Sequence, residues 1–165
     1  MITSTSSSQV KYVVNLQKKA KLRKEEKQFV VEGVKMVSEA PTDRLVKVYI
    51  SETFKADNEE FLERMNYDAL GKDVLEVVTD NVFMRMADTQ TPQGIMAVVR
   101  MTDTDLKGIL LDKRNPLLLI IENLQDPGNL GTIVRMAEGA GVTGIIMSSN
   151  TVDIYNPKTI RSTMG

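Results

Sequence analysis

The apolar positions of the first hundred residues change their period repeatedly, which predicts short helices and strands in alternation. In "VKYVVNLQKKAKLR" (residues 10–23) they recur at helical spacing with lysines between them. "LVKVYIS" (45–51) alternates apolar and polar residues as a strand does, and "GIMAVVRM" (94–101) indicates a last strand. Further strands are predicted at 29–31 and 74–79, and further helices near 34–40, 58–71 and 81–88. The pattern predicts a small α/β sandwich over residues 10–103, after a Ser/Thr-rich and disordered tail at 1–9.

A different pattern begins at residue 117, after a polar stretch at 104–116 that we interpret as a linker. The continuous apolar run "LLLII" is typical of a parallel strand covered on both faces. A helix at 131–138 and a second apolar strand, "TGIIMSS", complete a βαβ unit. In the closing stretch, Asn156 is a candidate N-cap and Pro157 the first residue of another helix.

Residues 117–165 contain too few elements to cover both faces of a parallel sheet. We therefore expect an incomplete domain there, completed by residues absent from this chain or by a partner chain.

The chain contains no Cys and no His, which narrows its possible chemistry. Clusters of His and Cys metal ligands and Ser-His-Asp or Cys-His relays are excluded. Proton transfer must therefore use Asp, Glu, Lys, Tyr, Arg, water or the substrate. The absence of Cys suits a reducing compartment, and we predict a cytoplasmic protein. We expect no membrane association, because no apolar run approaches the length of a membrane span.

Charge is distributed unevenly along the chain. Residues 1–35 carry eight Lys and Arg against three Glu, a net charge of +5, while the whole chain carries −1. A basic N-terminal arm is compatible with binding to a phosphate backbone. A solvated helix face explains the same pattern, so charge alone leaves both interpretations open.

The stretch "ENLQDPGNLGTIVRMAEGAG" (122–141) follows the apolar run and begins with a polar turn rich in Gly, Pro and Asn. A Gly-rich turn after a buried strand is typical of nucleotide phosphate sites, but "GNLGTI" fits neither the dinucleotide-binding nor the P-loop template. The next strand ends in Ser and Asn where a dinucleotide site needs an acidic residue. This argues against a metabolic enzyme with a Rossmann-like fold.

The same stretch closely resembles the first signature motif of the SpoU (TrmH) family of RNA 2′-O-ribose methyltransferases. "VDIYNPKTIRSTMG" resembles the start of that family's second motif. "KLRKEEKQFVVEGVKMVSEA" and "ADTQTPQGIMAVV" resemble the beginning and end of the family's additional N-terminal domain. The resemblance implies a small ribosomal-protein-like α/β RNA-binding domain, followed by the first part of a SPOUT-type parallel-sheet methyltransferase domain with an α/β knot.

The resemblance also implies roles for single residues. Asn123 and Arg135 match the family's active-site Asn and Arg, and Arg135 serves either as the base or by orienting the nucleotide and stabilising the developing alkoxide. From the residues alone, Asn123 and Asp126 are equally explained as turn and capping residues, Asn129 as an N-cap, and Arg135 as a solvated helix residue. The residues expected to contact RNA are Lys18, Lys19, Lys21, Arg23, Asn129, Lys158 and Arg161.

The implied reaction is transfer of a methyl group from S-adenosylmethionine to a ribose 2′-OH, without a metal. This type of N-terminal domain favours ribosomal RNA over transfer RNA, and the full-length parent is expected to be a homodimer. The residues that bind the cofactor stay unassigned and are expected mostly beyond Gly165, so we predict no methyl transfer by this chain alone. The alternative is a non-catalytic RNA-binding module.

Overall fold

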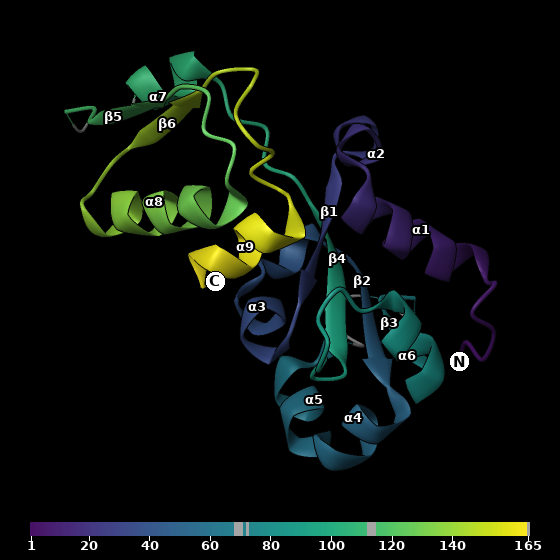
Figure 1. Cartoon of the computed structure of the whole chain (residues 1–165). Helices are drawn as coiled ribbons and strands as arrows, with labels where there is room; N and C mark the ends of the chain where they lie inside the picture. The colour runs from purple at the N-terminus through teal and green to yellow at the C-terminus, as the bar shows by residue number, and fades with distance from the viewer. Residues whose placement is uncertain (68–70, 72, 112–114, 165) are drawn as a thin grey trace. The chain divides into compact units, whose positions relative to one another are not determined.

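The computed structural model describes residues 1–67, 71, 73–111 and 115–164. The chain divides into two compact units, residues 1–101 and 102–164 (Figure 1). Each unit combines helices with strands, and the predicted α/β fold is confirmed. Among the described helices, none is both long enough and apolar enough to cross a membrane.

The first unit is built on a four-stranded mixed sheet with strand order β1-β4-β2-β3. β4 is antiparallel to both of its neighbours, while β2 and β3 run parallel. The strands are β1 (Gln28–Glu32), β2 (Leu45–Ser51), β3 (Leu75–Val78) and β4 (Ile95–Arg100). All four follow the predicted pattern, and β2 spans the residues predicted from "LVKVYIS".

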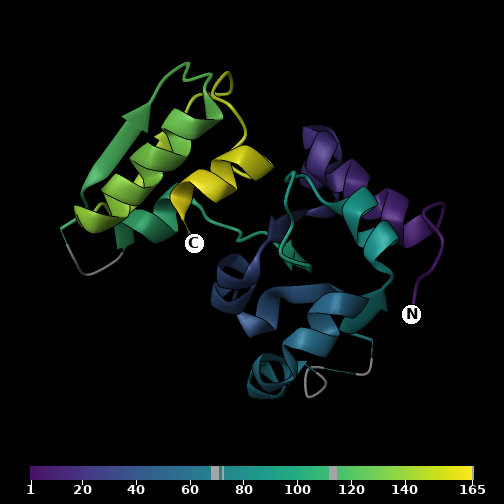
Figure 2. The ribbon, with the colours of Figure 1, turned by 60° about the horizontal axis from the view of Figure 1, so that its bottom comes forward.

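Helices cover both faces of this sheet. The helices of this unit are α1 (Ser8–Lys18), α2 (Ala20–Glu26), α3 (Val34–Glu39), a 3-10 turn (Thr42–Arg44), α4 (Glu52–Asp57), α5 (Glu59–Met65) and α6 (Asp80–Met86). α1 and α6 pack together (Figure 2). Val13 and Met86 contribute fully buried side chains to a core that also contains Tyr49 of β2. Burial raises the pKa of the Tyr49 phenol to about 12, with the Glu76 carboxylate as the next cause.

The helices after β2 differ from the prediction in two ways. The apolar pattern did not predict α4, which separates β2 from α5. The helix predicted to run to Gly71 ends as α5 at Met65, where Asn66 takes a left-handed conformation with φ 47°. Asn tolerates this conformation better than most residues, so it ends the helix as a glycine would. The rest of that prediction falls partly on residues 68–70, outside the described part of the chain.

The first nine residues are ordered, which corrects the prediction of a disordered tail. Ile2 pairs with Val78 at the edge of the sheet, where its N–H donates to the Val77 carbonyl at 2.9 Å and its carbonyl accepts from the Thr79 N–H at 3.1 Å. The Met1 ammonium lies 2.9 Å from a Glu76 carboxylate oxygen. An edge strand presents unpaired backbone groups that a short polar segment can satisfy, and composition does not reveal this.

The helix predicted over residues 10–23 is interrupted at Lys19, and Arg23 explains how the two pieces are joined. Arg23 is 2% exposed, and its guanidinium donates to the carbonyls of Leu16 at 2.6 Å and Gln17 at 2.8 Å. Arg23, a residue of α2, therefore satisfies carbonyls in the last turn of α1. The dipole of α1 also favours a cation at this carboxyl end of the helix. A buried guanidinium cannot reach an RNA phosphate, so the predicted RNA contact of Arg23 is wrong.

The second unit contains the predicted βαβ unit. Its elements are α7 (Leu106–Leu111), β5 (Leu118–Ile121), α8 (Pro127–Gly139), β6 (Gly144–Met147) and α9 (Pro157–Thr163). β5 and β6 are parallel, with Leu118 opposite Gly144 and Ile121 opposite Met147. Ile120 of β5 is 73% exposed. The incompleteness of this domain stays a prediction.

The stretch predicted as a linker at 104–116 contains α7, which corrects that prediction. Asp105 accepts a hydrogen bond from the Gly108 N–H at 2.5 Å in the first turn. Ile109 packs on β6 so closely that a Cβ at Gly144 would lie 2.8 Å from its Cγ2. The helical spacing of Leu106, Ile109 and Leu110 was obscured by the polar residues around them.

Replacing Arg23 by Met should destabilise the first unit by about 2 kcal/mol, because the α1 carbonyls lose charge-assisted hydrogen bonds in a buried place. Urea unfolding followed by circular dichroism measures the change. Lys24→Met is the matched control, because Lys24 is the exposed neighbour on the same helix and its replacement should change stability by less than about 0.5 kcal/mol. Equal unfolding midpoints for the two variants would contradict the capping role.

Candidate active site

Two loops meet at the carboxyl edge of the β5–β6 pair, where open α/β sheets commonly bind ligands. The Asn123 N–H donates to the Ser148 Oγ at 3.0 Å, and the Ser148 N–H donates to the Ile121 carbonyl at 3.0 Å. Farther along, the side-chain amide of Gln125 donates to the Asn150 backbone carbonyl at 2.5 Å, and the Val152 N–H donates to the Leu124 carbonyl at 2.8 Å. The loop after β5 is therefore held in place by the loop after β6.

Asn123 is the first functional candidate on this edge. Its backbone is left-handed, with φ 55°, a conformation that Asn adopts more readily than most residues. The side chain is exposed and makes no hydrogen bond to another residue in the described part of the chain. The turn interpretation of Asn123 is thus correct for its backbone, while its carboxamide stays available to a ligand.

The turn that follows starts α8 earlier than the sequence predicted. The Asp126 carboxylate accepts from the Asn129 N–H at 2.7 Å and caps the helix, and Pro127 is its first residue. The predicted start at Gly131 and the N-cap interpretation of Asn129 are therefore wrong, while capping by Asp126 is confirmed. Asn129 lies in the first helical turn with an exposed side chain.

α8 and α9 pack side by side (Figures 1 and 2). Gly131 of α8 lies at their contact. A Cβ at Gly131 would lie 2.5 Å from both the Thr159 carbonyl oxygen and the Ser162 Cβ, so no larger residue fits without displacing backbone. Asn156 caps α9 as predicted, by accepting from the Lys158 N–H at 2.9 Å, and Pro157 is its first residue.

Arg135 lies on α8 and is exposed. It is eight residues after Pro127, about 12 Å along the helix axis at 1.5 Å per residue. Its guanidinium is turned toward the carboxyl end of α9, where it donates to the Met164 sulfur. The structure thus places Asn123 at the strand edge and Arg135 farther along α8, each held by different neighbours.

The other predicted RNA-binding residues divide into two groups. In the second unit, Lys158 is exposed and Arg161 is half-buried on α9. In the first unit, Lys18, Lys19 and Lys21 are exposed; Lys21 is 3.8 Å from Glu25 on the same helix, an ion pair that contributes little at an exposed place. The residues described contain no group of three or more His, Cys, Asp or Glu placed to hold a metal.

Sequence reasoning missed the residues that hold the site together. Ser148 and Thr151 lie 3.1 Å apart through their hydroxyl oxygens, and Thr151 also donates to the Ile121 carbonyl at 3.4 Å. The sequence feature that could have indicated Ser148 is the pair of serines at the end of the second apolar strand. Hydroxyl groups at that position can contact the loop that follows the neighbouring strand.

The two parts of the chain match two protein families. The family described as "MRM3-like substrate binding domain" matches residues 7–97, more than half of the chain, and the "SpoU rRNA Methylase family" matches residues 116–165. The chain belongs to the SpoU (TrmH) family. The first match lies within the first unit of the chain, and the second match covers residues of the second unit.

Curated proteins with similar sequences include rRNA methyltransferases. The chain is 35% identical over 162 residues to "rRNA methyltransferase 3, mitochondrial" of Xenopus laevis, covering 93% of this chain and 36% of that protein. It is 36% identical over 89 residues to the 23S rRNA (guanosine(2553)-2′-O)-methyltransferase RlmP of Bacillus subtilis, covering 54% of this chain and 34% of that protein. The chain spans about a third of the length of these relatives.

Solved structures show the same fold. An AdoMet-bound rRNA methyltransferase from Sinorhizobium meliloti superposes with a TM-score of 0.81 and 28% identity, over 99% of this chain and 60% of that one. The SpoU methyltransferase AviRb from Streptomyces viridochromogenes has a TM-score of 0.74 at 23% identity and supports the fold alone.

Gly131→Ala should loosen α9 from α8 and lower stability by about 1–3 kcal/mol, because its Cβ would overlap the backbone of α9. Hydrogen exchange of the α9 amides, together with urea unfolding, measures this. Gly139→Ala is the matched control, since nothing lies within 4 Å of a Cβ there and the loss of a helical glycine is neutral or stabilising. If the α9 amides exchange equally slowly in both variants, the contact at Gly131 does not hold α9 against α8.

Proposed function

We propose that this chain is part of an enzyme that transfers a methyl group from S-adenosylmethionine to a ribose 2′-OH of ribosomal RNA. The observation that carries the proposal is the chain's match to a substrate-binding family and to the SpoU methylase family in successive segments. Support also comes from relatives whose names specify rRNA methyltransferases and 2′-O-methylation.

The cofactor proposal rests on the AdoMet-bound rRNA methyltransferase from Sinorhizobium meliloti, to which this chain is similar. In this chain Asn123, Asn129 and Arg135 are all exposed, whereas a small-molecule site buries most of its ligand. These residues do not enclose S-adenosylmethionine by themselves, so we assign them to the RNA and derive no step through the cofactor.

We propose that these side chains position the ribose and stabilise the negative charge that develops on its 2′ oxygen. An Asn carboxamide both donates and accepts, so Asn123 can hold a sugar hydroxyl or a phosphate oxygen while its loop is fixed by Ser148. The guanidinium of Arg135 can bind the adjacent phosphate with paired donors and stabilise the oxyanion that develops as the 2′-OH loses its proton. Arginine resists deprotonation, so we propose that phosphate or water takes that proton.

The basic arm is proposed as a second contact with RNA. Lys18, Lys19 and Lys21 are exposed at the junction of α1 and α2, and Arg23 holds that junction from inside.

We also propose a homodimer for the complete protein and a cytoplasmic location. "Mitochondrial" in the names of the vertebrate relatives describes those proteins.

Arg135→Lys should reduce kcat for methyl transfer by roughly 100-fold with a smaller change in KM, because Lys keeps the charge but loses the paired, planar donors that meet charge in the transition state. Incorporation of tritium from labelled S-adenosylmethionine into ribosomal RNA measures it in the complete protein in which these residues occur. Glu138→Gln, an exposed change on the same helix, should leave kcat unchanged. Methylation of a base instead of a 2′-OH would refute the proposed reaction.

The same assay distinguishes the two asparagines. Asn123→Ala should lower kcat if the loop after β5 positions the ribose, whereas Asn129→Ala should mainly raise KM if it only binds RNA. The reverse result would assign the positioning role to the first turn of α8.

Replacing Lys18, Lys19 or Lys21 singly by Glu should weaken binding of ribosomal RNA fragments and reduce the salt dependence of binding. Removal of one ion pair with an RNA phosphate should lower the slope of log K against log salt by about one. Lys107→Glu, an equal charge change on α7 of the other unit, is the control. Fluorescence anisotropy over a salt series tests this, and identical slopes for all variants would remove the arm from the RNA interface.

A further inference from the structure

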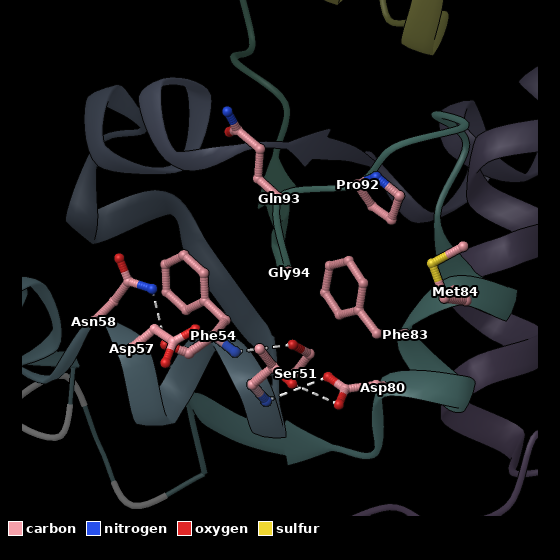
Figure 3. A pocket seen from close by; sticks show the side chains of 11 residues that line it. Ser51, Phe54, Asp57, Asn58, Asp80, Phe83, Met84, Pro92, Gln93 and Gly94 are labelled. Carbon is pink, nitrogen blue, oxygen red and sulfur yellow. Dashed lines mark hydrogen bonds between the residues drawn. The ribbon is translucent and has the colours of Figure 1, made fainter.

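A hollow of about 300 Å³ opens in the first unit at the end of the sheet where β2 and β3 finish (Figure 3). Three parts of the chain surround it: Ser51 and Phe54 at the start of α4, Phe83 and Met84 on α6, and the segment from Pro92 to Gly94 before β4. None of these residues belongs to the candidate active site or to the basic arm.

The walls of the hollow are apolar and fixed. Phe54 and Phe83 are 5% and 2% exposed, and Figure 3 shows their rings on either side of Gly94. Gly94 has φ +83°, and a Cβ there would lie 2.8 Å from the Phe54 Cβ and 3.0 Å from the Ser51 Oγ. The backbone therefore passes directly over the base of α4. Met84 is 56% exposed beside this hollow.

Neighbouring contacts hold the third wall in position. The Gln93 side-chain oxygen accepts from the Val34 N–H at 2.8 Å, and this fastens the segment before β4 to the start of α3. The Ser51 and Thr79 hydroxyls cap α4 and α6. A hollow bounded by two capped helices and an anchored segment keeps its shape when it is empty, which favours binding of a rigid ligand.

The polar groups of the hollow select against anions. Asp80 accepts from the Thr53 N–H at 3.2 Å and from the Thr53 hydroxyl at 2.7 Å, and the Thr53 hydrogen bonds hold the pKa of Asp80 below its ordinary value. Asp57 adds a second carboxylate, and the described residues that line the hollow include no Lys or Arg. A phosphate would be repelled, whereas a neutral ring that donates hydrogen bonds would be accepted.

We propose that this hollow binds one unstacked nucleobase of the RNA substrate. The proposal rests on the proposed function, because it takes RNA as the ligand of this domain. The size suits a single base or nucleoside, at the lower end of small-molecule sites. Apolar side chains contact the faces of the base, and the Asp57 carboxylate accepts from its edge, as the N1–H and amino group of guanine would offer.

The surroundings fit a nucleotide whose base is inside and whose phosphates are outside. Arg85, the residue after Met84 on α6, lines a second hollow of the first unit together with Lys11 of α1. Both cations are exposed, so the flanking phosphates can lie on them while the neutral base enters the hollow beside Met84.

The test compares two fluorescent heptaribonucleotides of equal charge, in which uridines flank either a central guanosine or a central abasic ribose. Anisotropy of the complete chain should show roughly tenfold tighter binding of the guanosine probe, since a stacked base contributes about that factor or more. Met84→Glu should abolish the preference, because it replaces an apolar side chain of the hollow by a hydrated carboxylate that does not pack on the face of a base. Asn81→Glu is the matched control, because it adds the same charge at an exposed position of α6 that does not line the hollow.

The outcomes separate this proposal from the proposed function. Equal binding of both probes by the unmodified chain would overturn the base site and leave RNA binding intact. A preference that survives Met84→Glu would place the base elsewhere and also overturn it. A preference abolished equally in Asn81→Glu would make the effect one of general charge, against the site. Failure of both probes to bind would overturn the base site together with the RNA assignment.

Discussion

The candidate active site depends on the fixed approach of two loops that follow parallel strands. Parallel strands end at the same edge of a sheet, but their loops need not meet there. In this chain the Asn123 N–H binds the Ser148 hydroxyl and the Ser148 N–H binds the end of β5. This exchange fixes the left-handed backbone of Asn123, and with it the direction in which α8 leaves the sheet.

Much of the fold could be predicted because local pattern and tertiary packing agree. The alternation in residues 45–51 predicted β2, and the Asn-Pro pair predicted the start of α9. Several of the failed predictions were decided by a partner elsewhere in the chain. Ile2 is ordered by β3, α7 is placed by β6, and Arg23 is buried by the carbonyls of α1. A sequence pattern records none of these partners.

The candidate site was predictable as a set of residues but not as a geometry. Resemblance to the family motif named Asn123 and Arg135, but it could not show that Asp126 rather than Asn129 caps α8. It also could not show that Arg135 is turned toward Met164, or that hydroxyls of the second loop hold the first. The hollow beside Phe54 had no motif at all, because three segments far apart in the sequence form it.

The packing of Ile109 against Gly144 has a practical consequence for dividing the chain. A recombinant second unit begun at the first residue of the apolar run, Leu117, would lose α7 and uncover the place on β6 that Ile109 fills. The truncated piece would then carry a bare patch of parallel strand and tend to self-associate. A boundary set ahead of Asp105 keeps both the helix and the carboxylate that supports its first turn.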